Sequence, residues 1–163
     1  MITIGIDNGS SGTVGVLGDT LPLFFETPTR PFLHYGKEGG TSNRLDGAEF
    51  VERLELAMGN TSRLVVRAFV ERPFTGKFYK AVVSAHRFFE ATIIALEQLD
   101  IGYEVVDSGE WQKALLGKVK GSAELKKASM LRGIQLYPQF KAHISKHGDA
   151  DGLLIAHHYH KLR

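Results

Sequence analysis

Three carboxylates stand at positions where they could hold a metal ion together. Asp7 follows the short apolar segment at the start of the chain, Glu71 ends a nearly uncharged apolar run, and Asp151 precedes a run of small and apolar residues. Hard divalent cations such as Mg²⁺ prefer oxygen ligands and leave coordination positions for water and phosphate. Two such ions about 3.5–4 Å apart can act together on a phosphodiester. If the three acids converge, they predict metal-dependent phosphodiester chemistry.

Each of these acids also has a simpler explanation. Asp7 stands before a turn that contains Gly and Ser, Asp151 could cap a helix, and Glu71 could be a solvated strand end. Glu71 is the least easily explained in this way, because it directly follows a run that should be interior. Spacing alone therefore leaves the convergence of the three acids open.

The elements that must position these acids form an alternating pattern. Short apolar and β-branched runs predict strands at 2–6, 13–17, 21–26, 64–70 and 101–106. Helical spacing predicts helices at 46–58, with Asp46 as N-cap, and at 80–99, 108–116, 122–137 and about 148–161. Residues 27–45 are rich in Pro, Gly, Thr and Arg and are predicted to form a surface loop. The order predicts an α/β fold, with a mixed sheet flanked by helices.

The composition excludes several other kinds of site. The chain has 163 residues and no Cys, which excludes disulfides, thiolate metal sites and a cysteine nucleophile. This length suits one domain spanning 1–163. No apolar run reaches membrane-spanning length, and the first residues do not resemble a secretion signal, so we expect a cytoplasmic protein without a membrane partner. The net charge of +2 is low for a protein coated in positive charge for nucleic acid.

Several motifs, taken together, resemble those of RuvC-type Holliday junction resolvases, particularly the phage-encoded branch. They are the segments 4–10 (IGIDNGS), 69–74 (FVERPF), 108–113 (SGEWQK), 125–129 (LKKAS) and 151–156 (DGLLIA). The resemblance spans almost the whole chain, in the right order and at suitable distances. It implies the ribonuclease H-like fold, in which three antiparallel strands and then two parallel ones form a five-stranded mixed sheet with helices on both faces.

The resemblance also implies an activity. Members of this family are homodimers that bind four-way DNA junctions and cut two strands by metal-dependent hydrolysis, leaving 5′-phosphate and 3′-hydroxyl ends. The chain would then be a crossover junction endodeoxyribonuclease of DNA recombination and repair. The resemblance implies two Mg²⁺ ions, for which Mn²⁺ could substitute. Asp7 would bridge both ions, while Glu71 and Asp151 would each help to hold one. A phage origin, and hence a bacterial or host cytoplasm, rests only on this resemblance.

The resemblance leaves the fourth metal ligand open between His147 and Asp149. The family carries an acid or a His one helical turn before the position of Asp151, and here Gly148 occupies the i−3 position. His147 could share the face of Asp151 if the last helix begins early enough. Asp149 lies on a different face of a regular helix and could instead be its N-cap. His147 could also be a solvated loop residue.

A lysine-rich stretch between the last strand and the last helix is predicted to face DNA. Lys126 resembles a family lysine near the scissile phosphate, with Lys127 as the alternative in register, and it could stabilise charge on that phosphate. Lys113 and Lys118 are expected to bind backbone phosphate. With Lys120, these residues predict a positive face around an acidic, metal-filled pocket.

Two aromatic or apolar features have competing interpretations. Phe74 resembles an aromatic residue that family members present to the junction centre, where it could stack on bases, and the alternative is a core Phe. Trp111 is expected to pack inside the protein. The helix at 80–99 has more apolar residues than one core stripe requires, so it should bury a second face. In the resembled family this helix lies at the dimer interface, and otherwise it would pack beneath residues 27–45.

Three other functions remain as alternatives. The segment 5–11 also resembles the first phosphate loop of nucleotide-binding phosphotransferases of the actin and sugar-kinase type. Those proteins need two such domains and a second phosphate loop, for which this chain lacks room. A related ribonuclease H-like nuclease could act on RNA, as in ribosomal-RNA maturation, or on other branched DNA. A non-enzymatic junction-binding protein becomes the better interpretation if the acids fail to converge.

Overall fold

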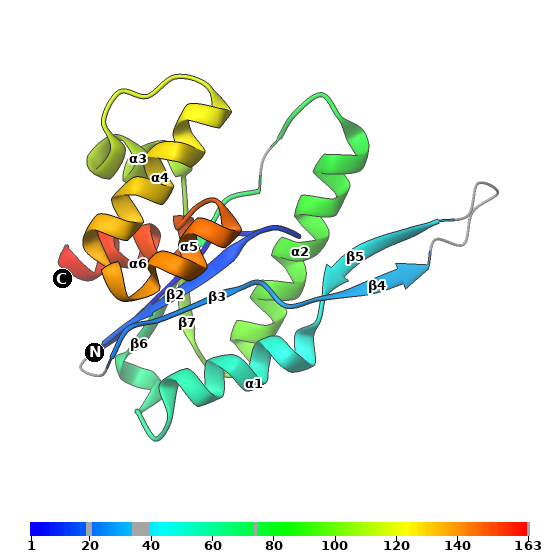
Figure 1. Ribbon diagram of the computed structural model, residues 1–163. Helices are drawn as coiled ribbons and strands as arrows, with labels where there is room; N and C mark the ends of the chain where they lie inside the picture. Colours follow the sequence, from blue (N-terminus) through cyan, green and yellow to red (C-terminus); the bar gives the residue numbers. More distant parts are fainter. Residues whose placement is uncertain (19–20, 34–39, 74, 163) are drawn as a thin grey trace.

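A five-stranded mixed sheet lies at the centre of the computed structural model, which describes residues 1–18, 21–33, 40–73 and 75–162 (Figure 1). Its strands stand in the order β3-β2-β1-β6-β7. They are β1 (Ile2–Ile6), β2 (Thr13–Leu17), β3 (Leu23–Glu26), β6 (Val66–Glu71) and β7 (Gly102–Val106). The pairs β1–β2 and β2–β3 are antiparallel, whereas β6 and β7 run parallel to β1. This arrangement confirms the predicted ribonuclease H-like sheet.

Helices cover both faces of the sheet (Figure 1). One apolar core lies between the sheet and the helices α1 (Gly47–Met58) and α2 (Tyr79–Gln98). A second core joins the other face to α3 (Ser108–Leu116), α4 (Ser122–Leu136), α5 (Lys141–His147) and α6 (Asp151–Lys161). Short 3-10 turns occupy Arg63–Val65 and Pro138–Phe140. The predicted cap of α1 is confirmed, because an Asp46 carboxylate oxygen accepts a hydrogen bond from the Glu49 N–H at 3.3 Å.

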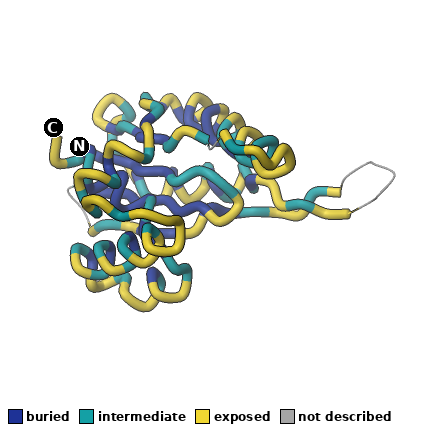
Figure 2. Tube along the Cα trace, turned by 90° about the horizontal axis from the view of Figure 1, so that it is seen from above, coloured by how far each residue is buried: buried dark blue, intermediate teal, exposed yellow. Residues whose placement is uncertain are grey.

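The prediction of a loop at residues 27–45 is wrong. The strands β4 (Thr29–Leu33) and β5 (Thr41–Leu45) pair antiparallel as a separate hairpin, with Phe32 opposite Ser42. The hairpin projects from the body of the molecule, and most of its residues are exposed or half-buried (Figure 2). Because neither of its faces is buried in the core, the sequence lacks the apolar–polar alternation that identifies a strand.

The predicted last helix at about 148–161 is confirmed, but it begins three residues later than expected, and the short helix α5 before it was not predicted. Helix α5 ends at His147, and Gly148 takes a left-handed conformation with φ of 101°. Helix α6 begins only at Asp151, and Ala150 rather than Asp149 is its N-cap residue. His147 therefore does not lie on the helix of Asp151, and Asp149 does not cap it. A glycine that ends one helix so close to the start of the next is compatible with a continuous helical pattern in the sequence.

Among the described residues, no helix combines the length and the apolar character that a membrane-spanning helix needs.

Candidate metal centre

Side chains alternate between the two faces of the sheet along each central strand, and this alternation directs two of the predicted acids to the same face. Along β1, Ile4 and Ile6 pack toward α1 and α2, so Gly5 faces α6. Along β6, Val70 packs toward α1 and α2, whereas Phe69 packs against Tyr159 of α6 with ring centroids 4.3 Å apart. Asp7 and Glu71 continue the α6-facing series of these two adjacent parallel strands. Both acids therefore emerge at the edge of the sheet where α6 begins.

Glycines let α6 pack directly on the sheet backbone. A Cβ on Gly5 would lie 2.9 Å from the Ala156 Cα, and one on Gly15 would lie 2.5 Å from the Leu153 Cα. A Cβ on Gly152 would lie 2.6 Å from the Thr13 carbonyl carbon. The Gly152 N–H also donates a hydrogen bond to the Thr13 hydroxyl at 2.9 Å. These contacts fix the first turn of α6, and with it Asp151, beside the end of β1.

Three carboxylates converge at this point. One ligand atom from each of Asp7, Asp149 and Asp151 lies within 4.8 Å of the other two. Asp149 is almost completely buried, and its Oδ1 has no hydrogen-bond partner among the described residues. Asp149 reaches the cluster although it stands only two residues before Asp151, because it precedes the helix and is not bound by helical geometry.

Glu71 lies beside this cluster rather than within it. Its Oε2 accepts a hydrogen bond from the indole N–H of Trp111 at 2.9 Å. Trp111 is fully buried, which confirms the prediction that it packs inside the protein. The buried indole thus sets the direction of the Glu71 carboxylate, and the charge of Glu71 still reaches Asp7.

Burial and mutual repulsion raise the pKa values of these acids. Burial, followed by the charges of Asp151, Glu71 and Asp149, raises the pKa of Asp7 well above its usual range. Burial raises the pKa of Glu71 to about 7, although the Trp111 hydrogen bond opposes the shift. Burial and the charge of Asp149 raise the pKa of Asp151 to about 6. Such carboxylates are costly to ionise together unless a cation joins them.

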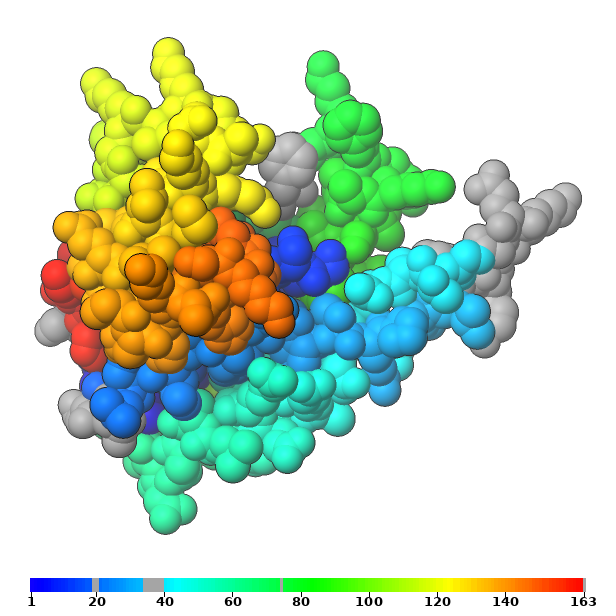
Figure 3. Space-filling model, in the orientation of Figure 1, coloured from blue at the N-terminus to red at the C-terminus, as the bar shows by residue number. Residues whose placement is uncertain are grey.

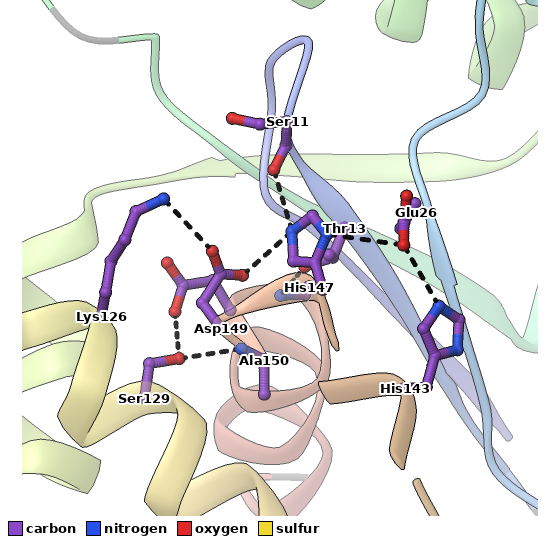
Figure 4. Close-up of polar contacts among 11 residues, drawn as sticks. Ser11, Thr13, Glu26, Lys126, Ser129, His143, His147, Asp149 and Ala150 are labelled. Carbon is purple, nitrogen blue, oxygen red and sulfur yellow. Dashed lines mark hydrogen bonds and ion pairs between the residues drawn. The ribbon is translucent and has the colours of Figure 1, made fainter. Parts of the chain in front are cut away.

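Helix α4 contributes two further groups to the cluster (Figure 4). The Ser129 hydroxyl donates to Asp151 Oδ1 and accepts a hydrogen bond from the Ala150 N–H at 3.1 Å. The Lys126 ammonium lies 3.7 Å from Asp149 Oδ2. The sequence predicted a role for Lys126 but none for Ser129, although Ser129 ends the 125–129 motif and lies one helical turn after Lys126.

The His147 ring lies between the carboxylates of Asp149 and Glu26 (Figure 4). Its Nε2 is 3.1 Å from the Ser11 carbonyl oxygen and 3.5 Å from Asp149 Oδ1, and its Nδ1 is 3.7 Å from Glu26 Oε1. Glu26, at the end of β3, was not predicted as a site residue. The imidazole is therefore held at the edge of the cluster from α5.

The remaining predicted DNA-binding residues are more distant from the acids or lie outside the described residues. Lys113 on α3, Lys118 and Lys120 in the turn after it, and Lys127 on α4 are all exposed. None of these four lysines makes an ion pair with a described carboxylate. Phe74 lies outside the described residues.

The donor set fits a hard divalent cation. All three clustered side chains offer carboxylate oxygens, the ligands that Mg²⁺, Mn²⁺ and Ca²⁺ prefer. Among the described residues, Lys126 is the one lysine within ion-pair distance of any of the three acids, and its partner is Asp149. Asp149 Oδ1 is buried and accepts no hydrogen bond from the described residues, so it is an acceptor that a cation would satisfy.

Without divalent ions, the melting temperature is expected to fall between pH 6 and pH 8, and Glu71→Gln should remove roughly 3–5 °C of that fall. The folded protein keeps the Glu71 proton up to about pH 7, while an unfolded chain loses it near its usual value of 4.5. Stability from this group is therefore present at low pH and is lost as pH rises through about 7. Thermal melts in EDTA measure the difference.

Mg²⁺ should restore the melting temperature at pH 8 and change it little at pH 6, since it binds the ionised acids. Glu55→Gln, an exposed acid on α1, is the matched control and should keep the wild-type pH dependence. An unaltered pH dependence in Glu71→Gln would contradict the assignment.

Comparison with known proteins supports the fold. No protein-family model matches the chain, and no curated protein matches it by sequence. Among solved structures, RuvC from T. thermophilus in complex with a Holliday junction substrate is similar, with a TM-score of 0.56 and 15% identity over 99% of this chain and 96% of that one. A further Thermus thermophilus RuvC structure has a TM-score of 0.50 and 18% identity over the same shares. The chain thus has the RuvC fold, and the likeness predicted from its sequence is confirmed at the level of the fold.

Proposed function

We propose that this chain is a RuvC-type endonuclease, a single nuclease domain over residues 1–163 that resolves four-way DNA junctions. The observation that carries the proposal is the convergence of Asp7, Asp149 and Asp151 at one end of a RuvC-like sheet. Neither a fold nor an acidic cluster indicates an activity alone. Here the two occur together. A similar solved structure with this fold holds a Holliday junction substrate, and the acidic cluster offers the ligands that a metal-dependent hydrolase needs.

Asp7, Asp149 and Asp151 are the residues that would hold Mg²⁺ or Mn²⁺, with Glu71 and His147 beside them. When bound, two such ions would activate water and stabilise the leaving oxygen of the phosphodiester. Hydrogen bonds from other side chains orient the carboxylates of this centre. Ser129 orients Asp151 through its hydroxyl, and the Trp111 indole orients Glu71. Lys126 supplies a positive charge next to Asp149, where it would attract a DNA phosphate.

The surroundings of the cluster support a DNA substrate. Lysines of α3, α4 and the turn between them are exposed, and Lys126 of the same α4 reaches the acids. Figure 3 shows this yellow and orange part of the surface facing the green helix α2, with blue atoms from the start of the chain between them. We propose a homodimer, because two centres are needed to cut two strands of one junction. The exposed side chains of Phe78, Tyr79 and Ile94 on and before α2 offer apolar area for association.

Cleavage of a synthetic four-way junction tests the function. We expect paired, symmetric nicks with 5′-phosphate and 3′-hydroxyl ends in Mg²⁺ or Mn²⁺, and no product in EDTA. Linear duplex of the same arm sequences and an RNA–DNA hybrid serve as controls and should stay intact. Equal cleavage of the hybrid would indicate a nuclease of the related RNA-directed type. Absence of cleavage with either metal would contradict the proposal.

A further inference from the structure

A second group of metal-ligating side chains lies beside the acidic cluster, at the end of β3. His143 and His147 are four residues apart on α5, and the side chain of Glu26 lies against both (Figure 4). Their Nε2 and Nδ1 atoms are 3.6 Å and 3.7 Å from the same oxygen, Glu26 Oε1. Two histidines at this spacing on one helix face, with a carboxylate as third ligand, form a recurring type of transition-metal site.

The two distances suit ligands of one ion better than hydrogen bonds. A charged hydrogen bond between an imidazole and a carboxylate is about 2.7–2.9 Å long, which is clearly shorter than 3.6 Å and 3.7 Å. Zn²⁺ binds nitrogen and carboxylate oxygen at about 2.0–2.2 Å, so tetrahedral geometry places neighbouring ligand atoms about 3.3–3.6 Å apart. Glu26 Oε1 is therefore nearly in position to share an ion with each histidine.

A backbone contact leaves one nitrogen of His147 available to a metal. Its Nε2 is 3.1 Å from the Ser11 carbonyl oxygen. Because a carbonyl oxygen only accepts, Nε2 carries the hydrogen in this bond, and the neutral ring presents the Nδ1 lone pair to Glu26. Metal-binding histidines commonly donate their other N–H to a carbonyl in this way. Two acceptors that face each other need a proton or a metal ion between them.

His143 is the more adjustable of the two histidines. Its ring packs against Phe24, two residues before Glu26 on β3, with ring centroids 5.0 Å apart. The three ligand atoms of this group do not all lie within 4.8 Å of one another, as those of the acidic cluster do. The side chain of His143 is 38% exposed, against 10% for His147, so its ring has room to turn toward an ion held by the other two ligands.

We propose that Glu26, His143 and His147 form a second metal site, which takes a transition-metal ion of the Zn²⁺ class and is separate from the all-carboxylate centre. Imidazole ligands suit Zn²⁺, Co²⁺ and Ni²⁺, whereas Mg²⁺ prefers oxygen. An ion at this site would tie β3, an edge strand of the sheet, to the seven-residue helix α5. The Glu26 side chain is half exposed, so a fourth position is open to water.

Histidine nitrogen NMR distinguishes this site from the acidic cluster. Long-range ¹H–¹⁵N spectra follow each ring nitrogen while Zn²⁺ is added to tag-free Asp7→Asn protein, in which the carboxylate centre is weakened, with Mg²⁺ in excess to compete for the remaining carboxylates. We expect the largest shifts at His147 Nδ1 and His143 Nε2, at the same Zn²⁺ concentration. Mg²⁺ alone should shift neither nitrogen. His86, an exposed histidine on α2, should keep its spectrum throughout.

Isothermal titration calorimetry in the same Asp7→Asn background measures the contribution of each ligand. His143→Gln and Glu26→Gln should each weaken Zn²⁺ binding by more than the roughly 10–100-fold that follows the loss of a group hydrogen-bonded to a ligand. The matched controls are His86→Gln and Glu55→Gln, which change exposed side chains on α2 and α1. Both controls should keep the original affinity and a stoichiometry of one ion per chain.

Other outcomes would overturn the site. Zn²⁺ binding that survives His143→Gln, or equal losses in the controls, would show that other groups hold the ion. A Zn²⁺-induced shift at His147 Nε2 alone would assign this histidine to the acidic cluster, since Nε2 is 3.5 Å from Asp149 Oδ1. An absence of Zn²⁺ binding would leave Nδ1 to a proton shared with Glu26. Because none of these measurements uses DNA, the site can fail while junction cleavage holds, and the reverse.

Discussion

Asp7→Asn is expected to reduce junction cleavage by at least about 10²–10³-fold, the loss typical when one preorganised electrostatic group leaves an active site. Asp7 lies at the end of the central strand, and its carboxylate belongs to the cluster with Asp149 and Asp151. Asparagine keeps the size of the side chain and one oxygen, but it removes the charge that a divalent ion needs. Single-turnover cleavage with saturating enzyme measures the chemical step apart from DNA binding.

The same substitution should not weaken the metal-free fold. Burial and three neighbouring acids raise the pKa of Asp7, so its ionised form is a cost to the folded state at neutral pH. We therefore expect Asp7→Asn to melt at the same or a higher temperature than wild type in EDTA at pH 8, and to gain less from Mg²⁺. A lower melting temperature in EDTA would show that Asp7 has a structural role instead.

Asp46→Asn provides the matched control for Asp7→Asn. It makes the same atomic change at the N-cap of α1, where asparagine caps about as well as aspartate. Cleavage and the response to Mg²⁺ should both remain at wild-type levels. Equal losses in both variants would mean that the effect on cleavage does not come from the acidic cluster.

The core of the fold was predictable because its signals are local. The strands of the central sheet are short apolar or β-branched runs, and α3 begins and ends where its sequence pattern predicts, at Ser108 and Leu116. Asp7 and Glu71 could be singled out for the same reason, since an acid directly after an interior run is unusual. Their approach to α6 could not be read from spacing, because it depends on backbone contacts between residues as distant as Gly5 and Ala156.

The parts that were missed depend on tertiary structure. Asp149 looked like a residue on the wrong face of a helix, and it joins the cluster only because Gly148 ends α5 and α6 starts at Asp151. The β4–β5 hairpin has no buried face to impose a period of two on its sequence. Helix α2 lies against β5, so the prediction that it would cover residues 27–45 holds for the hairpin, while its place in a dimer remains a prediction.

Gly152→Ala is expected to lower the free energy of unfolding by about 3 kcal/mol and the melting temperature by roughly 6–12 °C. The added Cβ would lie 2.6 Å from the Thr13 carbonyl carbon and 2.8 Å from the Val14 nitrogen. Both are backbone atoms of a central strand, which cannot rotate away as a side chain can. Thermal melts and denaturant unfolding measure the loss. Gly109→Ala is the control, because it also changes the second residue of a helix but its Cβ would meet nothing within 4 Å. It should be neutral or slightly stabilising.

The consequence for activity follows from where Gly152 lies. Relief of the clash requires α6 to move off β2, and Asp151, the adjacent residue, would move away from Asp7 with it. A misplacement of about 1 Å can cost on the order of 10² in rate. We therefore expect folded Gly152→Ala, assayed well below its melting temperature, to bind junction DNA normally, cleave it slowly and respond less to Mg²⁺. Wild-type cleavage by a destabilised Gly152→Ala would mean that the close packing of α6 serves stability alone, and that the acids are positioned by Ser129 and the turn at Gly148 instead.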